Sequence, residues 1–138
     1  MSVAASPALP GVRRVEHIMG LPIVLDVRGD CTSDVLDELF DWLRWVDATF
    51  STFKDDSEIS RINRDELRRE DAHPHVRQVL ERCEQLRNET DGYFDMRTPD
   101  GSIDPSGLVK GWAIARAAAT LDARGYRDYF IDAGGDVR

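Results

Sequence analysis

The 138-residue sequence lacks the features that mark exported, membrane-spanning and nucleic-acid-binding proteins. Its first residues, M-S-V-A-A-S-P-A-L-P, have no basic region followed by an apolar core, so they do not resemble a signal peptide. No apolar run approaches the length that crosses a membrane. The net charge is −8 and the positive charges are scattered, which argues against binding to nucleic acid. We therefore expect a cytoplasmic protein with no membrane or nucleic-acid partner.

Cysteine and histidine are also scarce. Cys31 and Cys83 lie far apart and form no C-x-x-C pair, so we expect buried or half-buried thiols without a metal or redox role. His73 and His75 flank Pro74 and are predicted to lie on the surface. A metal site at these histidines would need a third ligand, which the sequence does not place.

The composition and the hydrophobic periodicity predict one α+β domain. Hydrophobic residues at 41% and charged residues at 32% are typical of a globular protein. Small residues and prolines predict a disordered segment over residues 1–10. The remaining patterns predict, in order, a hairpin of strands over 12–19 and 22–28, helices over 33–48 and 75–90, a short strand at 93–95, a helix beginning near 106, and a strand before Gly134.

The stretch from Ile103 to Asp136 predicts a short extended segment, a helix and a strand that ends in a double glycine. Ser106 is a suitable N-cap residue for this helix, and Gly125 is a suitable C-terminal stop. The predicted buried stripe of the helix comprises Leu108, Trp112, Ala115 and Ala119.

The start of this predicted helix has the features of a phosphate site. Its first N–H groups have no intrahelical partner and therefore favour an anion. Gly107 keeps the approach open, and Lys110 adds a cation one turn further along. The same residues are also consistent with a capped, packed helix that carries a solvated lysine and binds no ligand. The segment is neither a Walker loop nor a G-x-G-x-x-G motif.

The segment F-S-T-F-K-D-D-S-E-I-S-R-I-N, residues 50–63, is dense in hydroxyl groups and acids. Its composition favours a connecting loop followed by a one-turn helix capped by Ser57.

The double glycine at Gly134 and Gly135 would let the backbone approach a ligand or another strand closely. Because the sequence stops soon after this strand, we expect it to be a piece of a longer protein. A strand edge exposed beside Gly134 would also invite self-association into a homo-oligomer.

Several segments in order resemble the FAD:protein FMN transferases, the ApbE-like family. They read H-I-M-G, F-S-T-F-K-D-D-S-E-I-S-R-I-N, T-D-G-Y-F-D, D-P-S-G-L-V-K-G-W-A and D-A-G-G-D, and they cover most of residues 15–136. The resemblance implies an α+β fold with a mixed or antiparallel sheet and packed helices, ApbE/T-fold-like and an incomplete domain. Residues 11–138 would be the N-terminal part of a flavin transferase domain.

The resemblance also implies a reaction. Enzymes of this family depend on magnesium, transfer the FMN moiety of FAD to a threonine hydroxyl of a target flavoprotein, and release AMP. Some relatives hydrolyse FAD, and others bind it. A non-catalytic FAD-binding or nucleotide-binding module, an FAD pyrophosphatase and a packed domain without a ligand therefore remain as alternatives.

The resemblance assigns roles to individual residues, although it assigns none as catalytic. It places Met19 and Phe53 in the flavin nucleotide pocket, and Tyr93, Phe94 and Asp95 in the segment that contacts FAD. The carboxylate of Asp104 would bind the nucleotide, and Lys110 would lie near the ligand. The main-chain carbonyl of Gly107 would belong to the magnesium shell. Aromatic side chains offer faces for the flavin or adenine rings, and a helix start with magnesium neutralises a pyrophosphate.

This sequence departs from the family pattern at three places. Leu21 replaces the threonine of the family's M-G-T, and Phe53 stands where the family often has tyrosine. The aspartate-and-threonine segment that holds magnesium in the family would fall beyond Asp136. The resemblance therefore implies a metal shell that these 138 residues do not complete.

Overall fold

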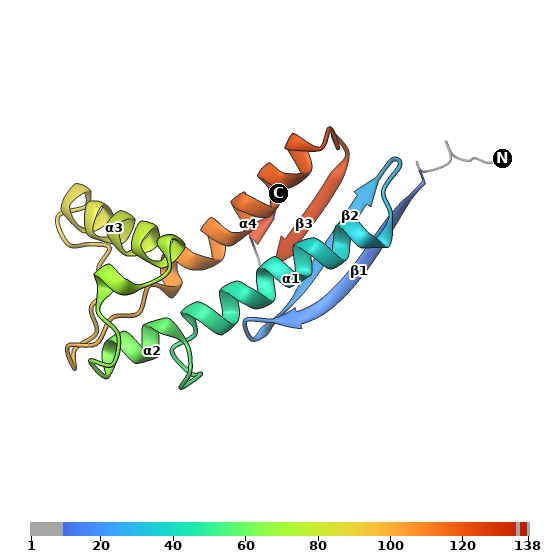
Figure 1. The fold of residues 1–138 in the computed structure, drawn as a ribbon. Coiled ribbons are helices and arrows are strands. Elements are labelled where there is room, and N and C mark those ends of the chain that lie inside the picture. The colour runs from blue at the N-terminus through green and yellow to red at the C-terminus, as the bar shows by residue number, and fades with distance from the viewer. Residues whose placement is uncertain (1–9, 135, 138) are drawn as a thin grey trace. The chain divides into compact units, whose positions relative to one another are not determined.

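A computed structural model of the chain describes residues 10–134 and 136–137, the last two by their backbone alone (Figure 1). The predicted disordered segment at the N-terminus lies, except for its last residue, outside the described residues. The described chain divides into two compact units. The first comprises Met1–Trp42 and Ile114–Arg138, and the second comprises Leu43–Ala113, and each is described by itself.

The first unit contains an antiparallel sheet, in agreement with the predicted α+β class. Its strands are β1 (Gly11–Ile18), β2 (Leu21–Arg28), β3 (Tyr129–Ala133) and β4 (Asp136–Val137), and they pair in the order β1-β2-β3-β4. One face of β2 and β3 is buried, because Ile23, Leu25, Val27, Ile131 and Ala133 alternate with more exposed residues. The sheet therefore supplies one wall of a hydrophobic core.

Helix α1 (Ser33–Phe50) and helix α4 (Ser106–Ala123) each contribute residues to both units. In the first unit, the Arg14 guanidinium of β1 reaches α1, where Nη1 lies 2.7 Å from Oδ1 of Asp37 and the group lies 5.6 Å from the centre of the Phe40 ring. The Arg124 guanidinium, just after α4, forms an ion pair with Glu38 of α1. These contacts fix both helices to their neighbours within this unit.

The predicted hairpin at the start of the chain is confirmed. Met19 and Gly20 alone connect β1 to β2, and both have positive φ angles, of 59° and 76°. Such a turn matches the right-handed twist of the paired strands. Met19, which has a side chain, therefore adopts a conformation that usually favours glycine.

The second unit contains the C-terminal part of α1, the short helix α2 (Glu58–Asn63), the 3₁₀ turn η1 (Arg69–Asp71), helix α3 (Pro74–Glu89) and the start of α4. The sequence predicts α1 and α3 to within two residues at each end. The prediction that His73 and His75 lie on the surface is wrong, because both are half-buried with ring centres 4.7 and 5.6 Å from that of Trp45. His73 is turned inward because its Nδ1 accepts the N–H of His75 and so caps α3.

Helix α4 also differs from its prediction in two respects. Its buried residues are Val109, Ala113, Ile114, Ala117, Ala118 and Leu121, whereas those of the predicted stripe are half-buried or exposed. The helix is apolar over most of its circumference, so its periodicity does not identify the buried face. Ser106 is the first helical residue and not the N-cap, because Oδ1 of Asp104 accepts its N–H.

The C-terminus of α4 follows the prediction. Gly125 has a φ of 86°, and its N–H donates to the carbonyl of Asp122. The N–H of Tyr126 donates to the carbonyl of Leu121, which completes a Schellman motif. No helix in the described part of the chain is long and apolar enough to cross a membrane.

The prediction that both thiols are buried or half-buried is confirmed. Cys83 is buried, and Cys31 is half-buried. Burial, followed by the nearby charge of Glu84, raises the pKa of the Cys83 thiol to about 11, so this thiol stays protonated and unreactive at neutral pH.

We expect substitution by alanine to have opposite effects on stability at two glycines, Gly111 within helix α4 and Gly125 just after it. Gly111→Ala should raise the free energy of unfolding by about 1 kcal/mol, because a Cβ at this helical position meets nothing within 4 Å. Gly125→Ala should lower it by about 1 kcal/mol, because alanine is strained at the φ of 86°. Urea denaturation of both variants tests this, and equal effects would contradict the assigned C-terminus.

Candidate functional site

The second unit contains three of the segments that the sequence analysis singled out. They are the hydroxyl-rich segment at 50–63, T-D-G-Y-F-D at 90–95 and the start of α4 at 104–110. The geometry of each is set by hydrogen bonds and ion pairs within this unit.

The hydroxyl groups of the first segment are mostly structural. Ser57, which is fully buried, accepts the N–H of Ser60 and so caps α2, and it donates to the carbonyl of Ser51 at 2.5 Å. Ser60 also donates to that carbonyl, at 3.3 Å. The predicted loop and one-turn helix capped by Ser57 are therefore confirmed. These bonds close the loop at its base, and Phe53 at its tip is 97% exposed.

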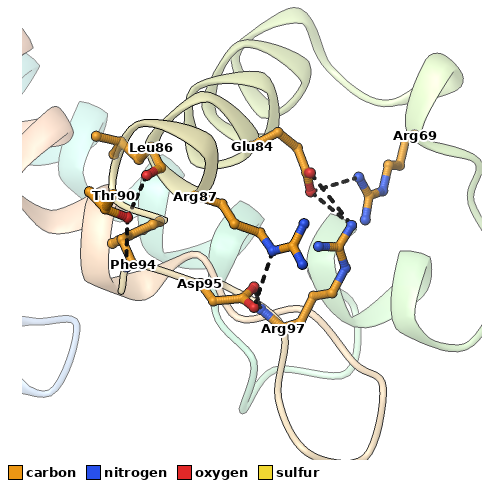
Figure 2. Close-up of polar contacts among 8 residues, drawn as sticks. All are labelled: Arg69, Glu84, Leu86, Arg87, Thr90, Phe94, Asp95 and Arg97. Atoms are coloured by element: carbon orange, nitrogen blue, oxygen red, sulfur yellow. Dashed lines mark hydrogen bonds and ion pairs between the residues drawn. The ribbon is translucent and has the colours of Figure 1, made fainter. Parts of the chain in front are cut away.

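The second segment begins at the C-terminus of α3 with a Schellman motif. The N–H of Gly92 donates to the carbonyl of Arg87 at 2.8 Å, and Asp91 takes the left-handed conformation with a φ of 53°. Figure 2 shows how Thr90 then fixes the next turn, because its Oγ1 donates to the carbonyl of Leu86 at 2.6 Å and accepts the N–H of Phe94 at 2.9 Å. The side chain of Thr90 therefore fixes the main chain of Phe94 in the turn that follows α3.

Asp95 is held by two arginines on the other side of the same turn (Figure 2). Its Oδ1 accepts the N–H of Arg97 at 2.9 Å, and its Oδ2 lies 3.4 Å from Nε of Arg87. The Arg97 N–H, followed by the charges of Arg87 and Arg97, holds the pKa of the Asp95 carboxyl below its ordinary value. Glu84 in turn pairs with the guanidinium groups of Arg97 at 3.2 Å and Arg69 at 3.9 Å.

The third segment meets the second. The N–H of Asp104 donates to the carbonyl of Met96 at 2.7 Å, and Oδ1 of Asp104 accepts the N–H of Ser106 at 3.0 Å. A methyl group on Gly107 would lie 3.4 Å from Cε2 of Phe94, so the start of α4 and the Phe94 ring are in close approach. The first amide of α4 therefore already has an anionic partner, which the predicted phosphate site did not include.

An open pocket of about 410 Å³ lies beside Asp104. Its lining residues include three with hydroxyl side chains, three acidic residues and one arginine, which are Thr52, Thr98, Ser102, Asp55, Asp100, Asp104 and Arg64. Thr52 is the neighbour of Phe53, so this pocket brings the first and third segments together. Its polar, oxygen-rich lining suits a ligand with hydroxyl or phosphate groups and a cation.

The remaining predicted site residues are placed separately. Tyr93 is 95% exposed, and Lys110 is half-buried in the second turn of α4. Met19 lies in the other unit, and it is half-buried in the hairpin turn described above. The ligand roles assigned to these residues stay predictions.

Gly107 is the second residue of α4, so its carbonyl points along the helix axis toward the C-terminal end of α4. Among residues 10–134 and 136–137, no group of three or more His, Cys, Asp or Glu side chains gathers to hold a metal ion. Magnesium in proteins is often bound by one or two carboxylates together with substrate phosphates and water.

Sequence reasoning missed Asn63, the last residue of α2. Its side-chain amide makes two hydrogen bonds with the main chain of Ile103, 40 residues further on. The sequence shows only an asparagine at the end of a short predicted helix, in S-R-I-N. A polar residue at such a position does not reveal a partner that is distant in sequence.

Comparison with protein families gives a match over most of the chain. The sequence model of the ApbE family matches residues 19–99 and 96–138, which together include most of the chain. No curated protein matches the sequence.

Several solved structures share the fold. The flavin transferase ApbE from Vibrio cholerae is 19% identical with a TM-score of 0.82, and the match covers 96% of this chain and 59% of that one. The flavinyl transferase ApbE from Pseudomonas stutzeri, in its apo form, is 16% identical with a TM-score of 0.81, covering 98% and 62%. The ApbE protein from Thermotoga maritima is 16% identical with a TM-score of 0.75, covering 94% and 58%. The chain thus spans about three fifths of these relatives.

We expect the hydroxyl of Thr90 to be required for the stability of the turn at Phe94. Thr90→Val should lower the free energy of unfolding by about 1 kcal/mol relative to Thr90→Ser, because serine keeps the acceptor for the Phe94 N–H. Urea denaturation gives the difference, and amide hydrogen exchange at Phe94 localises it. Equal stabilities and equal exchange rates in the two variants would show that this bond is dispensable.

We also expect the Asp95 carboxyl to titrate below an ordinary aspartate. Because its pKa is depressed in the folded chain, its interactions stabilise the fold above the unfolded pKa and are lost as the pH falls through the folded pKa. Arg87→Gln should raise the pKa of Asp95 and leave it still depressed by the Arg97 N–H. An NMR titration of the side-chain carboxyl checks this, with Arg77→Gln as a control on the same helix. An unchanged Asp95 midpoint in Arg87→Gln would be evidence against the ion pair.

Proposed function

The chain belongs to the ApbE family, and on that basis we propose that it acts in the transfer of the FMN moiety of FAD to a threonine hydroxyl of a target flavoprotein. The names of the similar structures, flavin transferase and flavinyl transferase, support this proposal. Because the chain spans about three fifths of those structures, the proposed role of these residues is to bind and orient FAD.

The proposed transfer breaks one bond and forms one. The threonine Oγ forms a bond to the phosphorus of the FMN moiety, and the bond from that phosphorus to the bridging oxygen breaks. AMP leaves with that oxygen, and the hydroxyl proton passes to a base. We assign no described residue as this base.

The observation that carries the proposal is the gathering of family segments in one compact unit. Asp104 and Thr52 line the same pocket, and Phe94 lies against Gly107 at the start of α4. Transfer of a phosphoryl group depends mainly on positioning and on neutralising charge, so a rigid arrangement of binding groups is what such a reaction requires. We propose that the Asp104 carboxylate binds the nucleotide and that Lys110 offsets negative charge near the pyrophosphate.

The exposed aromatic rings have a role in the same proposal. Phe53 and Tyr93 are almost entirely exposed, and each is carried by a turn whose base is fixed by hydrogen bonds. Planar faces held in this way suit stacking on flavin or adenine rings. We propose that these two rings, with Phe94, bind the ring systems of FAD, and that Asp95 anchors the segment that carries Phe94.

Magnesium belongs to the proposal as the ion that would neutralise the pyrophosphate when bound. The Gly107 carbonyl is the described group proposed to hold it. A carbonyl oxygen suits magnesium, but one oxygen is too few for a full shell, so water and the phosphates of FAD would supply other ligands.

The test is FAD binding by the 138-residue chain, measured by isothermal titration with and without magnesium and followed by chromatography for AMP. We expect binding that magnesium strengthens, and formation of AMP only after a flavoprotein with an acceptor threonine is added. Asp104→Asn should weaken FAD binding about tenfold or more, as the loss of a hydrogen bond to a charged group predicts. The control is Asp128→Asn, which changes the charge equally at an exposed position in the other unit.

The outcomes separate the candidate functions. Binding that is independent of magnesium and yields no AMP would favour a binding module. AMP and free FMN in the absence of an acceptor protein would favour a pyrophosphatase. A folded chain that binds no FAD would refute the proposal for these residues.

A further inference from the structure

Ile103 is held on one side by the segment that precedes it. Residues 97–103 form a tight turn in which the N–H of Thr98 donates to the carbonyl of Ser102 at 2.9 Å. The N–H of Asp104 donates to the carbonyl of Met96, and Arg97 and Ile103 lie opposite each other in an antiparallel bridge. In this pattern the N–H and carbonyl of Ile103 itself point away from the turn.

The side-chain amide of Asn63 supplies the hydrogen-bond partners for the N–H and the carbonyl of Ile103. Its Oδ1 accepts the N–H of Ile103 at 2.9 Å, and its Nδ2 donates to the carbonyl of Ile103 at 3.0 Å. A side-chain amide carries the same donor and acceptor groups as a peptide, so Asn63 takes the place of a neighbouring strand. Ile103 is only 5% exposed, so its main-chain groups would otherwise lose most of their access to water.

The residue that follows this pair is Asp104. Its main chain is fixed by Met96, and its carboxylate is fixed by the N–H of Ser106. Asn63 and Ile103 also line both the pocket of about 410 Å³ that contains Asp104 and a second open pocket of about 550 Å³. The pair is therefore part of the wall that the two pockets share, and its loss would let the segment with Asp104 move.

We propose that Asn63 is a positioning residue, which fixes the Asp104 carboxylate for the nucleotide by pairing with the main chain of Ile103. This inference rests on the proposed function, in which Asp104 binds FAD. Asn63 itself need not touch the ligand. The alternative is a purely structural pair that contributes to stability and leaves ligand affinity unchanged.

Asn63→Asp separates the two alternatives, because its pairing depends on pH. At pH 7.5 the carboxylate of the variant has no proton to donate and repels the carbonyl of Ile103. When it is protonated, its hydroxyl donates to that carbonyl and its other oxygen accepts the Ile103 N–H, so the pair re-forms. The ratio of the FAD dissociation constant in Asn63→Asp to that in the unaltered chain should be about 10 at pH 7.5, a change that corresponds to the loss of a hydrogen bond.

We expect this ratio to fall to about 2 at pH 4.5, because burial against the Ile103 carbonyl should raise the pKa of the introduced carboxyl above that of an ordinary aspartate. Dividing by the unaltered chain removes the effects of pH that the two chains share. Asn88→Asp is the matched control, since it adds the same charge on the exposed surface of α3, and its ratio should stay near 1 at both values of pH. A ratio for Asn63→Asp that is near 1 at pH 7.5, or that does not recover at low pH, would overturn the proposal.

Amide hydrogen exchange in the ligand-free chain makes the result independent of the proposed function. At pH 7.5, exchange at Ile103 and at Ser106 should be faster in Asn63→Asp than in the unaltered chain, because Ser106 reports on the Asp104 carboxylate. If the unaltered chain binds no FAD, the proposed function fails, and faster exchange at Ser106 still shows that Asn63 positions Asp104. Unchanged exchange at Ser106 refutes the positioning role in either case. If Asn63→Asp does not fold at pH 7.5, Asn63→Ser, whose hydroxyl is too short to make both bonds, gives the affinity ratio and the exchange rates at that pH.

Discussion

The paired hydrogen bonds between the Asn63 amide and the main chain of Ile103 are the constraint on which the candidate site depends. They join α2 to the segment that leads into α4, and so they link two parts of the chain that are 40 residues apart. Ser57 fixes the other end of α2 through its cap and its bond to Ser51. The loop that carries Phe53 and the segment that carries Asp104 are thus built on one short helix.

The polar residues around the site have different roles, which their residue types alone do not reveal. Ser57, Ser60 and Thr90 use their hydroxyl groups to close turns, and Arg87 uses its charge to hold Asp95. The aromatic residues Phe53 and Tyr93 remain exposed. A rigid polar frame with exposed rings is an arrangement that lowers the entropy cost of binding a planar ligand.

The sequence predicted the elements whose ends carry local signals. Gly20 marked the hairpin, Ser57 marked α2, and Asp91-Gly92 and Gly125 marked the ends of α3 and α4, because turn and cap residues act over a few positions. The buried face of α4 was missed because alanines surround that helix. The role of Asn63 was missed because its partner is distant in sequence, and the ligand role of Met19 came from resemblance and has no local physical signal.

In the proposed function, FAD binds at the start of α4, against Asp104 and the segment of Phe94. The most direct test is an NMR titration of the isotope-labelled chain with FAD, in which the backbone amide shifts are followed. We predict that the largest changes fall at residues 52–55, 93–96 and 103–108. Large changes confined to other residues, or none at all in a chain that is folded, would contradict it.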